Sequence, residues 1–148
     1  MAAKGPWHET VKKELNRFCA KAVPDDIDIT PETSWYHSEI DFKEPDFFIW
    51  PRSIPLREIS AATALLIVEV ADTSLDDLGR KARIYASLGV RDYWVIDARR
   101  LVTHVHRDPG TDGYGLVEQR GGGDLLVPAL APALAVRLSD LGLKPADG

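Results

Sequence analysis

The chain of 148 residues has the length of one domain and can bury a hydrophobic core, so we expect a single domain over residues 1–148. Hydrophobic residues make up 45% of the sequence and charged residues 28%, a composition that excludes a disordered or fibrous protein. The formal net charge of -5 argues against a protein that coats nucleic acid non-specifically, although a few lysines and arginines could still form a local basic face.

The N-terminal segment lacks the apolar centre of a signal peptide, and no uncharged apolar run approaches the length that spans a membrane. Residues 7–22 then carry apolar side chains at helical spacing and predict an amphipathic helix that ends before Pro24. Cys19, the single cysteine, lies on this helix, so the sequence offers neither a disulfide framework nor a cysteine metal cluster. Together these features predict a cytoplasmic protein with no membrane contact.

Two ionisable residues, His8 and Glu14, flank the apolar stripe of this first helix on opposite edges. Either one could point toward a site between the helix and a sheet. A solvated helix edge is the more ordinary interpretation of both.

The next segments predict strands. Residues 25–30 favour a short strand, and residues 35–50 a longer one that Pro45 interrupts. Beyond Pro45 the side chains of Asp46, Phe48 and Trp50 share one face of the strand, so a carboxylate begins a largely apolar segment. Residues 51–64 predict a loop with a possible helical turn, because two prolines disfavour regular structure there.

The centre of the chain, residues 65–97, predicts a strand, a crossover helix and a second strand. Glu69 interrupts the first apolar run near its end, where a buried carboxylate needs a partner or a metal. The helix is expected to run to about Leu88, with Gly89 as its left-handed stop. Lys81 lies on the edge of the inward stripe of this helix, so its ammonium could reach the carboxylate of Glu69.

The C-terminal third predicts a β-meander. Strands are expected at residues 101–106, 114–119, 125–127 and 134–138, with a glycine hairpin at residues 121–123. His104 and His106 share one strand face at a spacing that can bind zinc, but no third ligand is evident, and an exposed strand face is the more ordinary interpretation.

Three side chains could carry chemistry: Asp46, Glu69 and Lys81. If the two acid-bearing strands are neighbours, their carboxylates can hold a divalent cation through hard oxygen ligands, and Mg²⁺ suits such a site because it keeps several waters. Lys81 would then orient an attacking water or offset charge on a phosphate. The alternative is a buried ion pair between Glu69 and Lys81, with Asp46 only capping a turn, and spacing alone favours it.

The run VEVADTSLDDLGRKARIYASLGVRDYWVID, with EPDFFIW before it and VTHVHRDPGTDGYG after it, resembles the Uma-two family of restriction-endonuclease-like proteins. That family belongs to the PD-(D/E)XK nuclease superfamily. The resemblance implies an α/β fold with a restriction-endonuclease-like core: a mixed central sheet with an N-terminal helix and a crossover helix, extended by the β-meander. It also implies an endonuclease that hydrolyses phosphodiester bonds in DNA with Mg²⁺ or Mn²⁺.

The resemblance assigns roles to individual residues. The family's proline-aspartate falls on Pro45 and Asp46, its strand-end glutamate on Glu69, and its helical lysine on Lys81. In the wider superfamily the backbone carbonyl that corresponds to Val70 often joins the metal shell. The superfamily lysine normally stands two residues after the acid, where this chain has Ala71, so that role can only fall on the lysine of the next helix.

Four further residues match supporting positions of the family or superfamily. Asp77 matches an aspartate one turn before the lysine, and Tyr85 matches the helical tyrosine. His8 matches a histidine at the start of the first helix, and Glu14 matches the helix acid of the wider superfamily.

Two alternatives stay open beside the nuclease. The chain could be a catalytically inactive nuclease-fold module that binds nucleic acid or a protein partner, or a protein whose acids are only ion-paired. A homodimer is plausible, because cutting both strands of a duplex commonly uses two sites related by a twofold axis.

Overall fold

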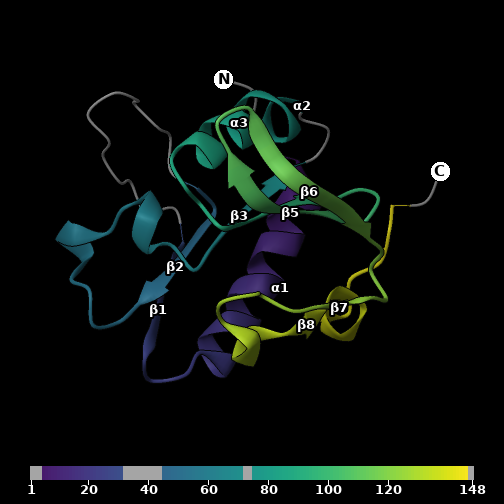
Figure 1. The fold of residues 1–148 in the computed structure, drawn as a ribbon. Coiled ribbons are helices and arrows are strands. Elements are labelled where there is room, and N and C mark those ends of the chain that lie inside the picture. The colour runs from purple at the N-terminus through teal and green to yellow at the C-terminus, as the bar shows by residue number, and fades with distance from the viewer. Residues whose placement is uncertain (1–4, 32–44, 72–74, 147–148) are drawn as a thin grey trace.

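The computed structural model describes residues 5–31, 45–71 and 75–146, and its central element is a six-stranded mixed sheet (Figure 1). The strands lie in chain order: β1 (Ile27–Pro31), β2 (Phe47–Pro51), β3 (Leu66–Ala71), β4 (Asp92–Asp97), β5 (Val102–Gly110) and β6 (Gly113–Arg120). Only β3 and β4 are parallel; every other neighbouring pair in this sheet is antiparallel. The parallel pair requires a crossover, as the sequence pattern predicted.

The crossover contains two short helices, α2 (Leu75–Leu78) and α3 (Arg80–Ser87), rather than the single helix that was expected. The break falls at Gly79, whose φ of -105° and ψ of -88° lie outside the helical region. Glycine is a poor helix former, which accounts for the break at this position. The predicted stop is confirmed, since Gly89 has a φ of +86°.

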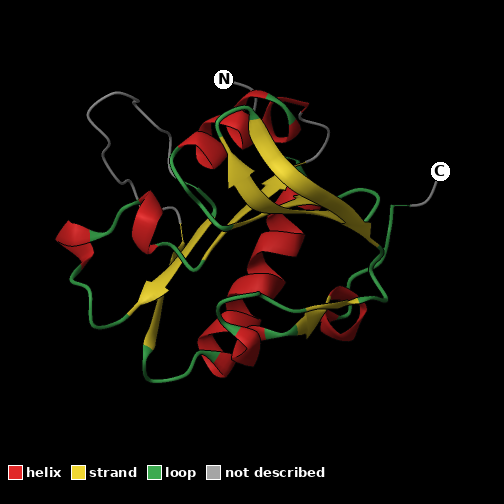
Figure 2. Ribbon diagram, in the orientation of Figure 1, coloured by secondary structure: helices red, strands yellow, loops and turns green. Residues whose placement is uncertain are grey.

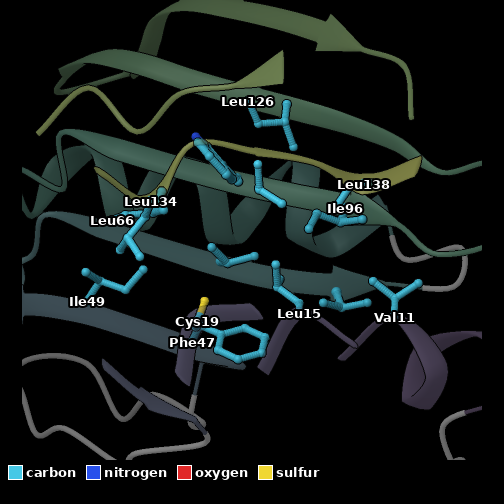
Figure 3. Packing of buried hydrophobic residues seen from close by; sticks show 14 of the residues in the cluster. Val11, Leu15, Cys19, Phe47, Ile49, Leu66, Ile96, Leu126, Leu134 and Leu138 are labelled. Atoms are coloured by element: carbon cyan, nitrogen blue, oxygen red, sulfur yellow. The ribbon is translucent and has the colours of Figure 1, made fainter. Parts of the chain in front are cut away.

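One face of the sheet is covered by α1 (Pro6–Ala22), the amphipathic helix predicted from the first apolar stripe. Figure 3 shows Val11, Leu15 and Cys19 of this helix packed with strand residues such as Phe47 and Ile49. The opposite face carries Phe48 and Trp50 and is covered by α3, by the 3₁₀ turn η2 (Ala61–Thr63) and by Ile54 and Ile59, which flank a second, exposed 3₁₀ turn, η1 (Leu56–Glu58). The two turns confirm the helical character expected in the loop after β2.

The last two strands, β7 (Leu125–Leu126) and β8 (Val136–Arg137), form a separate antiparallel ribbon beside α1 (Figure 2). The expected glycine hairpin from β6 into β7 is therefore wrong. Gly122 instead allows a close approach of the chain to Leu101, since an added Cβ would lie 2.7 Å from its Cδ2 atom. Leu126, 2% exposed, and Val136 extend the core on the α1 face. Two further 3₁₀ turns, η3 (Pro132–Leu134) and η4 (Leu138–Leu141), flank β8.

The expectation of an exposed face at the two strand histidines is wrong for His106. Its side chain is buried, with ring centroids 5.1 Å from Tyr93 and 5.4 Å from Tyr114. Its Nδ1 atom lies 3.0 Å from the carbonyl oxygen of Tyr93. Alternation along β5 did not indicate that α3 would pack over this face.

The predicted strand before Pro45 falls largely on residues 32–44, outside the described part of the chain. Among the described helices, none combines the length and the apolar character needed to span a membrane.

Candidate active site

The candidate site lies where β2 begins and β3 ends, two points that an antiparallel register brings side by side. Asp46 immediately precedes β2, and Glu69 lies near the end of β3. The backbone N–H of Asp46 donates a hydrogen bond to Glu69 Oε1 at 2.9 Å, and the N–H of Val70 donates one to Asp46 Oδ2 at 2.7 Å. Each carboxylate therefore binds the backbone of the opposite strand, and both acids are buried, at 3% and 4% exposure.

Lys81 reaches this pair from the crossover. Its Nζ atom donates a hydrogen bond to Glu69 Oε2 at 3.1 Å and lies 2.9 Å from Asp77 Oδ1. About a quarter of the Lys81 side chain, 26%, remains exposed, so the ammonium group stays in contact with solvent. The predicted reach from the helix edge to Glu69 is confirmed, and Asp77 holds Lys81 from its second side.

The start of α1, which covers the other face of the sheet, approaches the carboxylate of Asp46. His8 is buried, and its Nε2 atom lies 3.5 Å from Asp46 Oδ2. One helical turn later, Lys12 places Nζ 3.8 Å from Asp46 Oδ1. Sequence reasoning missed Lys12; its i+4 spacing from His8 was the signal that could have identified it.

Glu14 is not part of this cluster. Its carboxylate lies 3.7 Å from Lys13 Nζ, and its side chain lines an open pocket near the far end of α1 together with Arg17, Phe18 and Asp140. Glu14 therefore does not lie beside Asp46 and Glu69, where the expected supporting role would require it. His8 occupies the helix edge that faces the sheet end.

Tyr85 lies under the cluster, fully buried, with its ring 4.9 Å from that of Tyr93. Burial raises the pKa of the Tyr85 hydroxyl, and the negative charges of Glu69 and Asp77 raise it further. The tyrosine is thus neutral at every physiological pH and lies in the electric field of the carboxylates.

Burial also raises the pKa of Glu69, to about 7. The Lys81 charge opposes this rise, whereas the charges of Asp46 and Asp77 add to it. For Lys81, burial alone would lower the pKa, but the neighbouring charges of Glu69 and Asp77 outweigh burial and the net effect raises it. Lys81 is therefore charged at neutral pH, while Glu69 is close to its point of half-protonation.

The donor set of this cluster fits a hard divalent cation. Three carboxylates, on Asp46, Glu69 and Asp77, face two ammonium groups, so the cluster carries excess negative charge when the acids are ionised and His8 is neutral. In an extended strand the N–H and C=O of one residue point to the same side, which places the Val70 carbonyl on the edge that faces Asp46.

Within the described ranges, no three His, Cys, Asp or Glu side chains form a ready-made metal site. A cation would therefore use two carboxylates, a backbone carbonyl and water, which matches the preference of Mg²⁺ for few protein ligands.

Comparison with solved structures shows the same fold in nucleases. A crystal structure described as "a putative nuclease belonging to DUF820 from Anabaena variabilis ATCC 29413" matches 95% of this chain and 82% of its own, with a TM-score of 0.73 and 19% identity. The type IIG restriction endonuclease BpuSI matches 91% of this chain with a TM-score of 0.52 and 15% identity, but the match spans only 16% of that longer chain. These likenesses establish a restriction-endonuclease-like α/β fold.

No curated protein matches the chain. The family described as "Uma2: Putative restriction endonuclease" matches residues 1–139, which include every residue of the candidate site. The resemblance found in the sequence is thereby confirmed at the level of the family and of the fold. The chain belongs to the Uma2 family.

Proposed function

We propose that this protein is a metal-dependent endonuclease that hydrolyses phosphodiester bonds in DNA. The observation that carries the proposal is the convergence of Asp46, Glu69 and Lys81. Glu69 accepts hydrogen bonds from the backbone N–H of Asp46 and from Lys81 Nζ, and Asp46 accepts one from the backbone N–H of Val70 beside Glu69. Membership of a family described as "Putative restriction endonuclease" supports the reaction class and DNA as the substrate.

In this proposal the carboxylates of Asp46 and Glu69 and the carbonyl of Val70 are the oxygens that would hold Mg²⁺ or Mn²⁺. The cation would supply an activated water and compensation of phosphate charge. Lys81 holds the Glu69 carboxylate in one orientation and is itself oriented by Asp77. Its ammonium group is then placed to position the attacking water or to offset the charge that develops on the phosphate.

The test is cleavage of supercoiled plasmid DNA by the purified full chain in Mg²⁺ and in Mn²⁺. We expect the wild type to nick the plasmid, and Asp46→Asn and Glu69→Gln each to lose the activity. Glu14→Gln is the matched control, because it neutralises an acid on α1 that lies outside the cluster. Equal cleavage by the wild type and Glu69→Gln would contradict the assignment.

One observation favours a second candidate, a nuclease-fold module that binds nucleic acid or a partner without cutting. Lys81 closes on both Glu69 and Asp77, at 3.1 and 2.9 Å, and such a closed ion-pair network can be purely structural. Calorimetric titration with Mn²⁺ separates the two candidates. A nuclease takes up metal in an Asp46-dependent way, and the binding module does not.

The homodimer expected from the need to cut both strands is part of the proposal. Light scattering coupled to size-exclusion chromatography measures it directly. A twofold pair would place two sites on one duplex.

A further inference from the structure

His8 brings a buried nitrogen to the candidate site that no hydrogen bond within the described chain uses. The residue is only 2% exposed, and its Nε2 atom has no hydrogen-bond partner among the described residues. Asp46 Oδ2 lies 3.5 Å from this nitrogen, without the geometry of a hydrogen bond. A buried polar atom of this kind destabilises a fold unless something binds it, so the placement of Nε2 beside a carboxylate calls for an explanation.

The second ring nitrogen indicates which form of the imidazole faces Asp46. His8 Nδ1 lies 3.3 Å from Glu9 Oε1, and because an ionised carboxylate only accepts hydrogen bonds, Nδ1 is the nitrogen that carries the N–H. In the neutral ring Nε2 then has a free lone pair. This lone pair faces the lone pairs of a carboxylate oxygen, an arrangement that is favourable only when a cation lies between the two acceptors.

The separation of the two acceptors fits that arrangement. Two atoms that each lie about 2.1 Å from a cation, at an angle of about 90–115°, are about 3.0–3.5 Å apart. The observed separation of His8 Nε2 from Asp46 Oδ2 is 3.5 Å. A histidine that binds a metal usually donates its other N–H to a carboxylate, which fixes the orientation of the ring, and Glu9 occupies that outer position here.

We infer that His8 Nε2 is a ligand of the divalent cation at Asp46, in a position that water would otherwise fill. The inference rests on the proposed function and deepens it, because it concerns which metal the site takes. The oxygens of Asp46, Glu69 and Val70 suit Mg²⁺, whereas an imidazole nitrogen suits transition metals. His8 therefore shifts the preference of the site from Mg²⁺ toward Mn²⁺ and, more strongly, toward Co²⁺.

The alternative is that His8 is protonated and acts only as an ion-pair partner of Asp46. The two roles have opposite effects on metal binding. A positive charge beside Asp46 competes with a cation, so removal of His8 would strengthen metal uptake. In that case the bound metal would also have only oxygen neighbours. Removal of a ligand weakens metal uptake instead, and it removes a nitrogen from the metal shell.

The experiment compares the full-length wild type with His8→Gln and His104→Gln, and Mn²⁺ alone is the spectroscopic probe. His104→Gln is the matched control, since it removes an imidazole from β5, which β4 separates from β3. Pulsed electron paramagnetic resonance detects nitrogen coupled to the bound Mn²⁺. Calorimetry measures the affinities for Mn²⁺, Co²⁺ and Mg²⁺, and circular dichroism verifies the fold.

A second measurement needs no substitution and decides the matter if His8→Gln does not fold. The wild type is produced with histidine that carries ¹⁵N in its ring. A histidine ligand then changes the coupling of the bound Mn²⁺ from that of ¹⁴N to that of ¹⁵N.

We expect nitrogen coupling in the wild type and its loss in His8→Gln. The Mn²⁺ and Co²⁺ affinities of His8→Gln should fall by about tenfold to 100-fold, and its Mg²⁺ affinity should fall less. His104→Gln should match the wild type in every measurement. Bound Mn²⁺ without nitrogen coupling in the wild type, or tighter Mn²⁺ binding by His8→Gln, would overturn the inference.

The two proposals fail separately. A wild type that cleaves plasmid DNA but binds Mn²⁺ without nitrogen coupling loses only this inference. One that shows the coupling and its dependence on His8 but does not cleave DNA loses only the proposed hydrolysis. A wild type that takes up no Mn²⁺ refutes the inference outright.

Discussion

The variant Glu69→Gln tests whether burial raises the pKa of Glu69 as strongly as the structure indicates. The folded protein raises the pKa of Glu69 from its ordinary value of 4.5 to about 7. At about 1.36 kcal/mol for each unit of pKa, this difference corresponds to about 3 kcal/mol. The Glu69 side chain is only 5% exposed, so solvent screening reduces this figure little.

The sign follows from which state binds the proton more tightly. Between pH 4.5 and 7 the folded protein keeps the Glu69 proton while the unfolded chain releases it. The contribution to stability is therefore complete below about pH 4.5 and is lost as the pH rises through 7. Of this contribution to stability, about 2.5 kcal/mol is lost as the pH rises from about 5 to about 8.

Glutamine has the shape of glutamate but does not titrate. In urea unfolding without divalent ions, the free energy of unfolding of the wild type should fall by about 2.5 kcal/mol relative to Glu69→Gln between about pH 5 and about pH 8. Glu14→Gln, which alters an acid outside the cluster, should keep the wild-type profile. Parallel profiles for the wild type and Glu69→Gln would refute the burial and the electrostatics derived for this site.

Three further predictions concern other parts of the account. Lys81→Met should slow plasmid cleavage about 100-fold. Mn²⁺ uptake in calorimetry should be kept or improved, because the amine that competes for Glu69 is gone. Loss of both cleavage and Mn²⁺ uptake would contradict the role given to Lys81. Asp92→Ala should lower the free energy of unfolding by about 3–5 kcal/mol, since it leaves Arg107 without its buried partner at 3.2 Å, and it should not alter Mn²⁺ uptake. Gly89→Ala should cost about 1–2 kcal/mol in urea unfolding, because its φ is +86° and only backbone strain opposes the added methyl group; an unchanged stability would argue against the left-handed stop.

Much of the crossover unit could be predicted because its signals are local. Glu69 is a single acid in an apolar run, Gly89 follows a helical pattern, and Lys81 lies on the helix edge nearest the strand end. Each of these features is fixed by the period of a strand or a helix. Predicting that Asp46 lies beside Glu69 required one further assumption, that their strands are neighbours in the sheet. The register of β2 with β3 confirms this assumption.

The parts that failed depend on packing between elements far apart in sequence. The two edges of α1 look equivalent in the sequence, so only the packing of the helix on the sheet shows that His8 and Lys12 face Asp46 while Glu14 does not. The strand pattern around Leu126 fits a hairpin with the preceding strand as well as it fits a separate ribbon. In the structure Leu126 is buried in the core beside α1, and its strand pairs with β8 in a separate ribbon. Periodicity identifies the faces of an element but does not identify what covers them.

The most direct test of the central claim is anomalous diffraction from crystals of the full chain soaked in Mn²⁺. The account predicts one strong peak at about 2.0–2.4 Å from oxygens of Asp46 and Glu69 and from the Val70 carbonyl, with Lys81 moved away from Glu69 Oε2. A peak elsewhere, or no peak with Lys81 still 3.1 Å from that oxygen, would contradict a cation site at these two carboxylates.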